Sequence, residues 1–132
     1  MKNLLTYAPD GRGLKLKLPV PEGTLEGVPT RVGDLLVLPT TPRATAALRQ
    51  TTGVPQGLRN GEASCDIPGL THLLATGPGT ELGVLFDGAT PGQKVYRVNG
   101  ALASAGTDVQ HIGFVIPLPE PVRGFGVGIL GN

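Results

Sequence analysis

The side chains that could perform chemistry are few and scattered along the chain. Ser64, His72 and Asp87 have the residue types of a hydrolase triad, and Cys65 with His72 or His111 has those of a thiol nucleophile and its base. Neither Ser64 nor Cys65 lies in a nucleophile-elbow sequence. The sequence therefore predicts no catalytic residues, and we expect the protein not to be an enzyme. Both histidines are expected to be half-exposed and to hydrogen-bond locally.

A metal site would need His72, His111, Asp87 and Asp108 to meet, because imidazole and carboxylate groups are suitable ligands. No two of these residues have the local spacing typical of a ligand pair. We therefore expect no metal and no cofactor. Asp108 ends the turn-forming segment 105–108, where an aspartate usually accepts hydrogen bonds from backbone amides.

A literal Gly-x-Gly-x-x-Gly pattern runs from Gly126 to Gly131. A dinucleotide-binding fingerprint follows the first strand of its domain and opens a helix, whereas this pattern is followed only by Asn132. The sequence context therefore argues against a nucleotide site. We expect a glycine-rich final strand or tail that passes close to another backbone, for example that of a neighbouring subunit.

Arginine outnumbers lysine, and most arginines lie near the ends of expected strands or in loops. They can form a solvated surface, or they can make bidentate pairs with carboxylates of a partner protein, for which the planar guanidinium is well shaped. The sequence leaves both roles open for the whole set, which comprises Arg12, Arg31, Arg43, Arg49, Arg59, Arg97 and Arg123.

Composition limits the class of protein. The 132 residues suffice for one domain with one core. A formal net charge of +1 with 11 scattered basic residues provides no basic stripe for nucleic acid, and no apolar run approaches the ~20 residues of a membrane helix. Hydrophobic residues (39%) outweigh charged ones (16%), so the 21 glycines and 13 prolines indicate turns between short strands rather than disorder. Cys65, which has no disulfide partner, is expected to be a buried thiol.

The N-terminal half predicts an arm and a few strands. Residues 1–14 show no sustained periodicity and are expected to form an extended arm. From Leu14 to Leu18 leucines alternate with lysines, which is the period of a strand with one wet face. The apolar run 32–38 between prolines predicts one buried strand. Segment 40–52 fits either a short helix that Thr41 caps or a strand edge, and both remain open.

The rest of the chain predicts strands separated by turns. Asn99-Gly100 is the strongest hairpin signal, because both residues tolerate the positive φ angles of a type I′ turn. Several short strands at regular spacing with one doubtful helix predict an all-β domain, either a small barrel or a sandwich. The expected strands are 62–67, 70–75, 82–86, 94–98, 101–103, 112–116 and 124–130.

The order of these features resembles the small capsid decoration, or cement, proteins of tailed bacteriophages. The resemblance covers roughly residues 30–130, and its motifs are a central Gly-Glu strand pair, a Gly-x-x-Val-Tyr strand with a tight turn, and an Ile-Gly-x-Val strand. The segment 39–59 is longer than the family's usual connection, and the tail is richer in glycine. The matching residues are Gly61, Glu62, Ile67, Gly69, Gly92, Val95, Tyr96, Ile112, Gly113 and Val115.

The resemblance implies a β-rich domain on the outer face of an icosahedral head, where it binds the major capsid protein, commonly as a homotrimer, and reinforces joints between capsid subunits. The domains would then be an N-terminal arm, 1–14, and a β-barrel decoration domain, 15–132. Because residues 1–13 lack a pattern, they are the first candidates for a contact that orders only on binding. It implies localisation on the virion exterior after assembly in the host cytoplasm. No catalytic, cofactor-binding or metal-binding residue, no nucleic acid and no membrane comes with it.

A second class remains open from the residues alone, namely a non-catalytic β-barrel module that binds a ligand or a protein within a larger complex. Sugar-binding sites usually offer aromatic platforms. This chain has no tryptophan and only two tyrosines and three phenylalanines, which disfavours a sugar ligand.

Overall fold

The computed structural model describes residues 4–8, 13–51, 57–80, 82–118 and 124–130. Within these ranges strands dominate, with one short α-helix and one turn of 3-10 helix, so the predicted all-β class is confirmed. The elements are β1 (Leu4–Tyr7), β2 (Leu14–Pro19), β3 (Thr30–Val32), β4 (Leu35–Pro39), α1 (Ala46–Thr51), β5 (Glu62–Ile67), β6 (Leu70–Ala75), β7 (Lys94–Val98), β8 (Ala101–Ala103), η1 (Asp108–Gln110), β9 (His111–Pro117) and β10 (Phe125–Leu130).

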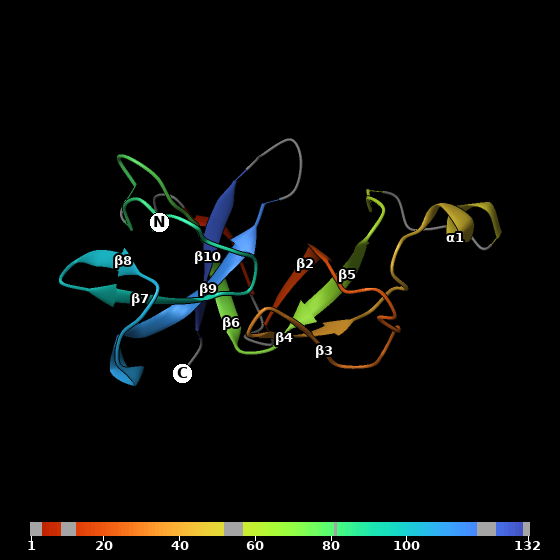
Figure 1. The fold of residues 1–132 in the computed structure, drawn as a ribbon, viewed down its shortest axis with the longest axis horizontal. Helices are drawn as coiled ribbons and strands as arrows, with labels where there is room; N and C mark the ends of the chain where they lie inside the picture. The colour runs from red at the N-terminus through yellow and green to blue at the C-terminus, as the bar shows by residue number, and fades with distance from the viewer. Residues whose placement is uncertain (1–3, 9–12, 52–56, 81, 119–123, 131–132) are drawn as a thin grey trace.

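The strands form two antiparallel sheets (Figure 1). The six-stranded sheet has the order β1-β6-β10-β9-β7-β8, and the four-stranded sheet has the order β2-β5-β4-β3. Neither sheet closes on itself among the described strands, so the sandwich-like alternative fits and the closed barrel does not. Helix α1 lies at the end of the four-stranded half, far from the six-stranded sheet (Figure 1).

The main core lies between the two sheets. Leu18 of β2 and Ile67 of β5 pack in one cluster with Leu70 of β6 and Ile116 of β9, and all four are at most 1% exposed. Successive side chains of a strand point to opposite faces, so each sheet contributes one face to this cluster. The opposite face of each sheet does not belong to this cluster.

The chain crosses from one sheet to the other at a sharp turn after β5. Pro68 and Gly69, which has a φ of +89°, connect β5 of the four-stranded sheet directly to β6 of the six-stranded sheet. β1 and β2 make the same change of sheet alongside, because β1 pairs with β6 and β2 pairs with β5. The amide of Ala8 donates to the carbonyl of Thr71 (2.9 Å), which extends the β1–β6 pairing to the crossing.

A second joint holds the β3–β4 turn against the six-stranded sheet. The amide of Asp34 donates to the carbonyl of Gly92 (3.0 Å), and the amide of Gly92 donates to the carbonyl of Val115 in β9 (2.8 Å). Gly92 has a φ of +79°, and a Cβ there would overlap with the carbonyl of Val32. Both the backbone conformation and the close approach therefore require glycine at position 92.

The glycines of β10 make room for its neighbours, and the predicted glycine-rich strand at 124–130 is confirmed. A Cβ at Gly128 would lie 2.6 Å from Cδ1 of Leu70, and a Cβ at Gly126 would lie 3.3 Å from Cδ1 of Leu73. A Cβ at Gly113 of β9 would overlap with the carbonyl of Gly128. The predicted close approach to another backbone is thus made within this chain.

The remaining strand predictions mostly hold. Strands are present at 62–67, 70–75, 94–98 and 101–103, and β9 contains the predicted 112–116. The Asn99-Gly100 hairpin is confirmed, because Val98 pairs with Ala101 and both turn residues have positive φ angles of 52° and 82°.

The prediction of one strand over 32–38 is wrong. Gly33, with a φ of +60°, and Asp34 form a turn that divides the run into β3 and β4, which pair with Val32 opposite Leu35. Val32 and Leu35 are both buried, so the apolar pattern continues through the turn and hides it. A polar Asp34 at the turn was the available local signal.

The prediction of a strand over 82–86 is also wrong, because this segment is irregular. Leu82, Leu85 and Phe86 pack against a second cluster on the outer face of the six-stranded sheet. The segment is apolar because it covers a sheet, and it belongs to no ladder. The buried residues beneath it are Val95, Leu102, Val115 and Val127.

The arm predicted for residues 1–14 contains regular structure. Leu4–Tyr7 form β1, an edge strand of the six-stranded sheet, with Tyr7 opposite His72. These four residues show no periodicity of their own, and their strand conformation depends on the pairing with β6. Residues 1–3 and 9–12 lie outside the described part of the chain.

The two alternatives for segment 40–52, a strand edge and a short helix, are each correct for part of the segment. The amide of Thr40 donates to the carbonyl of Ser64 (2.8 Å), so this end continues the strand edge along β5. The helix forms later, at Ala46–Thr51, and its cap is Thr45 rather than Thr41, because the Thr45 hydroxyl accepts from the amide of Leu48 (3.0 Å).

Candidate functional site

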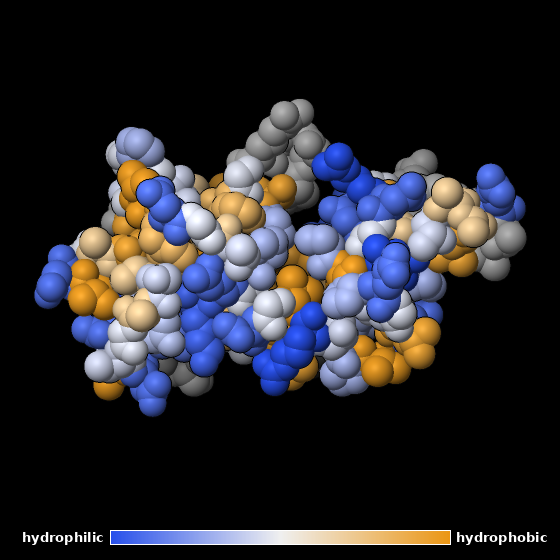
Figure 2. All heavy atoms as spheres, viewed as in Figure 1, coloured by the Kyte–Doolittle hydropathy of each residue, from blue (hydrophilic) through white to orange (hydrophobic). Residues whose placement is uncertain are grey.

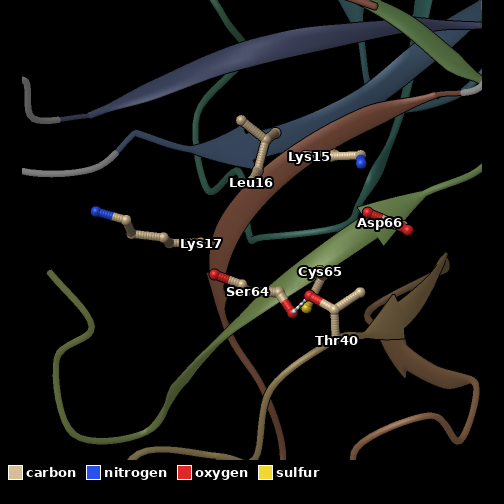
Figure 3. Close-up of a pocket in the computed structure, with 7 residues that line it drawn as sticks. All are labelled: Lys15, Leu16, Lys17, Thr40, Ser64, Cys65 and Asp66. Carbon is tan, nitrogen blue, oxygen red and sulfur yellow. Dashed lines mark hydrogen bonds between the residues drawn. The ribbon is translucent and has the colours of Figure 1, made fainter. Parts of the chain in front are cut away.

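A groove with a volume of about 500 Å³ runs along β2 and β5 of the four-stranded sheet (Figure 3). In the close-up, Leu16 points toward the strands of the six-stranded sheet, while Lys17 extends away from them. The lining is a mixture of cationic, anionic, hydroxyl and apolar groups. Its residues are Lys15, Leu16, Lys17, Thr40, Ser64, Cys65 and Asp66.

The strand register determines which side chains meet in this groove. Lys15 lies opposite Asp66 and Lys17 lies opposite Ser64 on the face of the sheet that turns away from the core. Directly opposite side chains of an antiparallel pair are about 5 Å apart at Cβ. The Thr40 hydroxyl donates to the Ser64 carbonyl (3.2 Å), which brings the end of β4 to the same place. Two cations and one carboxylate therefore share this face.

Cys65 is a buried thiol, as predicted. It is 1% exposed, and its Sγ donates to the carbonyl of Ala63 (3.5 Å). Burial raises the pKa of the Cys65 thiol from 9.0 to about 11, and the carboxylate of Asp66 adds to the shift. A thiol with this pKa stays protonated near neutral pH, which makes it a weak nucleophile.

The two histidines are half-buried and bond locally, as predicted. Nδ1 of His72 lies 2.9 Å from the hydroxyl of Thr71, and Nε2 of His111 lies 2.9 Å from the carbonyl of Gly113. The His111 ring also packs between two aromatic rings, those of Tyr96 and Phe114, at centroid distances of 5.1 Å each. These contacts account for His111 as a packed surface residue.

The residues of the hypothetical triad lie on separate elements. Ser64 is in β5 of the four-stranded sheet, His72 is in β6 of the six-stranded sheet, and Asp87 is exposed in the segment that covers the outer face. Among the described residues, no group of three or more histidine, cysteine, aspartate or glutamate side chains is arranged to hold a metal.

The role predicted for Asp108 belongs to another residue. Asp108 is exposed at the start of η1, and the side chain that accepts from the backbone in this turn is Gln110, whose Oε1 accepts from the amide of Thr107 (2.9 Å). Gln93 does the same for the amide of Thr90 (3.0 Å). In both turns the sequence signal was a glutamine three residues after a threonine.

The Gly-x-Gly-x-x-Gly pattern lies in a central strand. β10 pairs with β6 on one side and β9 on the other, so its backbone amides are engaged in two ladders. Amides in this arrangement are not directed at a common point, as a phosphate cradle requires. Gly131 lies outside the described residues.

Two arginines bond to backbone within the chain. Nη1 of Arg31 donates to the carbonyl of Asp34 (3.0 Å), and Nε of Arg43 donates to the carbonyl of Val20 (3.0 Å). These two support the turn after β3 and the end of β2. Arg97 is exposed on β7, and Arg12 and Arg123 lie outside the described residues.

The sequence pattern identified the lysines of β2 as a wet strand face but did not place them in a site. Their partners Thr40, Ser64 and Asp66 come from segments about 25 to 50 residues away, and only the register brings them together. The alternation of lysine with leucine was the one local signal, and it is also typical of an ordinary exposed strand.

Comparison of the chain with models of protein families, with curated proteins and with solved structures finds no match. No helix in the described part of the chain is long and apolar enough to cross a membrane.

Proposed function

We propose that this protein is a structural decoration, or cement, protein of a tailed-phage head. It binds the outer surface of the head as a homotrimer and stabilises contacts between major capsid subunits. It acts by burying surface against its neighbours, so it needs no catalytic residue and no cofactor. Many copies on one lattice add avidity to individually weak contacts.

The resemblance of the sequence motifs carries the proposal, and the positions of those motifs support it. Gly92 forms the joint between the sheets, and Ile112, Gly113 and Val115 lie in β9 near the centre of the six-stranded sheet. Gly69 forms the turn that takes the chain from one sheet to the other. Five of the ten matching residues therefore lie at the connections between the sheets or in a central strand.

Exposed apolar side chains near β4 offer a contact surface. Leu25, Val28 and Leu36 are 64%, 49% and 42% exposed. The turn that carries Leu25 and Val28 is tied to β4, because the amide of Gly27 donates to the carbonyl of Pro39 (2.8 Å). Figure 2 shows apolar residues gathered over the loop before β3, at the lower right of the view. Apolar side chains in a polar setting are typical of protein contact surfaces.

Cosedimentation with undecorated heads tests the proposal. Heads assembled from the major capsid protein that the same genome encodes should bind the purified protein at saturating stoichiometry. Binding should fall at least tenfold for Leu25→Ser/Val28→Ser. Val109→Ser is the matched control, because Val109 is 95% exposed on η1 and away from this surface. Absence of stoichiometric binding by the unmodified protein would remove the proposal.

Light scattering of the free protein tests the trimer separately. We expect a trimer at high concentration, and native mass spectrometry of protein released from heads should give the same number of chains. A monomer both free and on the lattice, seen as single copies in images of decorated heads, would contradict the trimer while leaving head binding intact.

The groove on β2 and β5 favours a second candidate, a non-catalytic module that binds a ligand or a protein within a larger complex. A concave surface with a few convergent polar groups is the usual form of a ligand site. Failure of head binding together with specific binding of another partner in this groove would select this candidate.

A further inference from the structure

β2 presents the longest open strand edge in the described structure. The strands at the ends of the two sheets are β1, β8, β2 and β3, with four, three, six and three residues. Short edge strands are one way in which proteins avoid unwanted pairing. β2 is longer and in the described chain pairs only with β5, so its protection against unselective pairing is the charge of Lys15 and Lys17 and the absent amide proton of Pro19.

The hydrogen-bond pattern shows which residues of β2 face the open edge. Val20, one residue beyond β2, donates from its amide to the carbonyl of Gly61 (2.9 Å), which places the even-numbered residues in the ladder with β5. On the other side of β5, the carbonyl of Ser64 accepts from the amide of Thr40, so the same alternation holds there. Alternate residues of an antiparallel strand face opposite edges. The backbones of Lys15 and Lys17 therefore face outward.

The side chains along this edge have a fixed order. Lys15 and Lys17 are exposed on the outer face, and Leu16 between them is half-buried on the face toward the core. The groove described above begins at these residues (Figure 3). Pro19 ends the available edge, because it has no amide proton to donate.

We propose that the open edge of β2 binds an extended segment of a partner polypeptide, which adds to the four-stranded sheet as a fifth strand. Its residues opposite Lys15, Leu16 and Lys17 are acidic, apolar and acidic. The amides and carbonyls of both lysines supply the backbone bonds, which are the main source of affinity in strand addition. The charge and hydropathy of the neighbouring side chains supply selectivity.

The observations favour this partner over a second copy of the same edge. Two β2 edges side by side would bring lysines against lysines, and like charges directly opposite each other are destabilising. The acidic-apolar-acidic order is the same in both chain directions. A parallel and an antiparallel partner strand can therefore both place acidic residues opposite Lys15 and Lys17. Binding of a partner strand to β2 does not depend on the proposed function, because it follows from the strand order and the hydrogen-bond pattern alone. A free peptide therefore tests it without phage heads.

The test uses NMR of the ¹⁵N-labelled full-length protein with a capped peptide of sequence GTEVEVETG. At saturation, exchange of the Lys15 and Lys17 amides should slow at least tenfold, whereas the Leu16 amide, already in the β5 ladder, should change little. The peptide GTKVKVKTG is the matched control and should bind at least tenfold more weakly. Equal binding of both peptides, or no protection of the two lysine amides, overturns the proposal.

Variants separate the backbone from the charges. Lys17→Pro removes one outward amide without removing a bond to β5, so it should abolish peptide binding while the Leu16 and Leu18 amides keep their protection. Lys15→Glu/Lys17→Glu should reverse the preference between the two peptides. Lys94→Glu is the matched control, because Lys94 is exposed on β7, whose two edges are both paired.

A series of protein concentrations without peptide tests pairing between two copies of β2. If the exchange of the Lys15 and Lys17 amides slows as the protein concentration rises, the edge binds a second copy and the proposal is overturned.

Discussion

The six-stranded sheet and the four-stranded sheet use their faces differently. The six-stranded sheet packs Ile116 into the core between the sheets and Val115, the preceding residue, into the second cluster beneath the segment 82–89. The four-stranded sheet buries one face in the same core, but its other face carries Lys15, Lys17 and Asp66. In the part of the chain that the structure describes, the six-stranded sheet therefore has apolar packing on both faces and the four-stranded sheet on one face only.

This difference indicates where each sheet's sequence is constrained. In the six-stranded sheet, glycines and branched apolar residues are required by packing on both faces. In the half-covered sheet, alternate residues are free of packing and can serve recognition. Both the groove and the open edge of β2 lie on the half-covered sheet.

The largest effect should come from the core that the two sheets share. Ile116→Ala removes a side chain that is 1% exposed and should lower the free energy of unfolding by about 2 to 5 kcal/mol. Leu36→Ala, on the open face of β4, should cost less than about 1 kcal/mol, because Leu36 is 42% exposed. Urea unfolding followed by circular dichroism measures both. Similar costs would contradict the contrast between buried and open faces.

The joint between the sheets should give the next largest effect. Gly92→Ala and Gly88→Ala place alanine at similar φ angles of +79° and +76°, but only the Cβ at position 92 meets another backbone, that of Val32. We expect Gly92→Ala to destabilise the protein by about 2 kcal/mol more than Gly88→Ala. Thermal or urea unfolding of the two variants measures the difference in their free energies of unfolding. Equal free energies would show that the backbone at Val32 can move to accommodate the Cβ at position 92 at little cost.

Cys65 makes the stability of the four-stranded sheet depend on alkaline pH. Because the folded thiol has a pKa of about 11 rather than 9.0, only the unfolded chain ionises between these values, and the free energy of unfolding falls as pH rises through this window. The slope approaches about 1.4 kcal/mol per pH unit. Cys65→Ala should lack this slope when both proteins are unfolded in urea from pH 8 to 11. Parallel profiles would show that the thiol is not buried.

The smallest effect is expected at the hairpin that ends the six-stranded sheet. Asn99 has a φ of +52°, a conformation that costs alanine about 1 kcal/mol. Asn99→Ala should therefore lower stability by roughly that amount, whereas Asn99→Gly should leave it nearly unchanged. Chemical denaturation measures both variants. A loss for glycine as large as for alanine would point to a side-chain role of Asn99.

Local patterns were sufficient where one segment carries its own signal. The alternation of leucine with lysine predicted β2, and Asn99-Gly100 predicted the β7–β8 hairpin, because strand period and turn chemistry depend on adjacent residues. The same holds for β5, β6 and the burial of Cys65. The strand pair at 30–39 was predicted as a single strand, because Val32 and Leu35 remain buried on both sides of the turn and their apolar pattern outweighed the local signal of Asp34.

The sequence by itself determined the all-β class and most strand positions. The tertiary structure decided how strands divide between two sheets, that Leu4–Tyr7 pair with β6, and that 82–86 cover a sheet instead of joining one. It also decided that Lys15 lies opposite Asp66 and that β2 is an edge strand of the described four-stranded sheet. These outcomes depend on pairings between distant segments, whose energies come from shared burial and ladder bonds that no single segment contains.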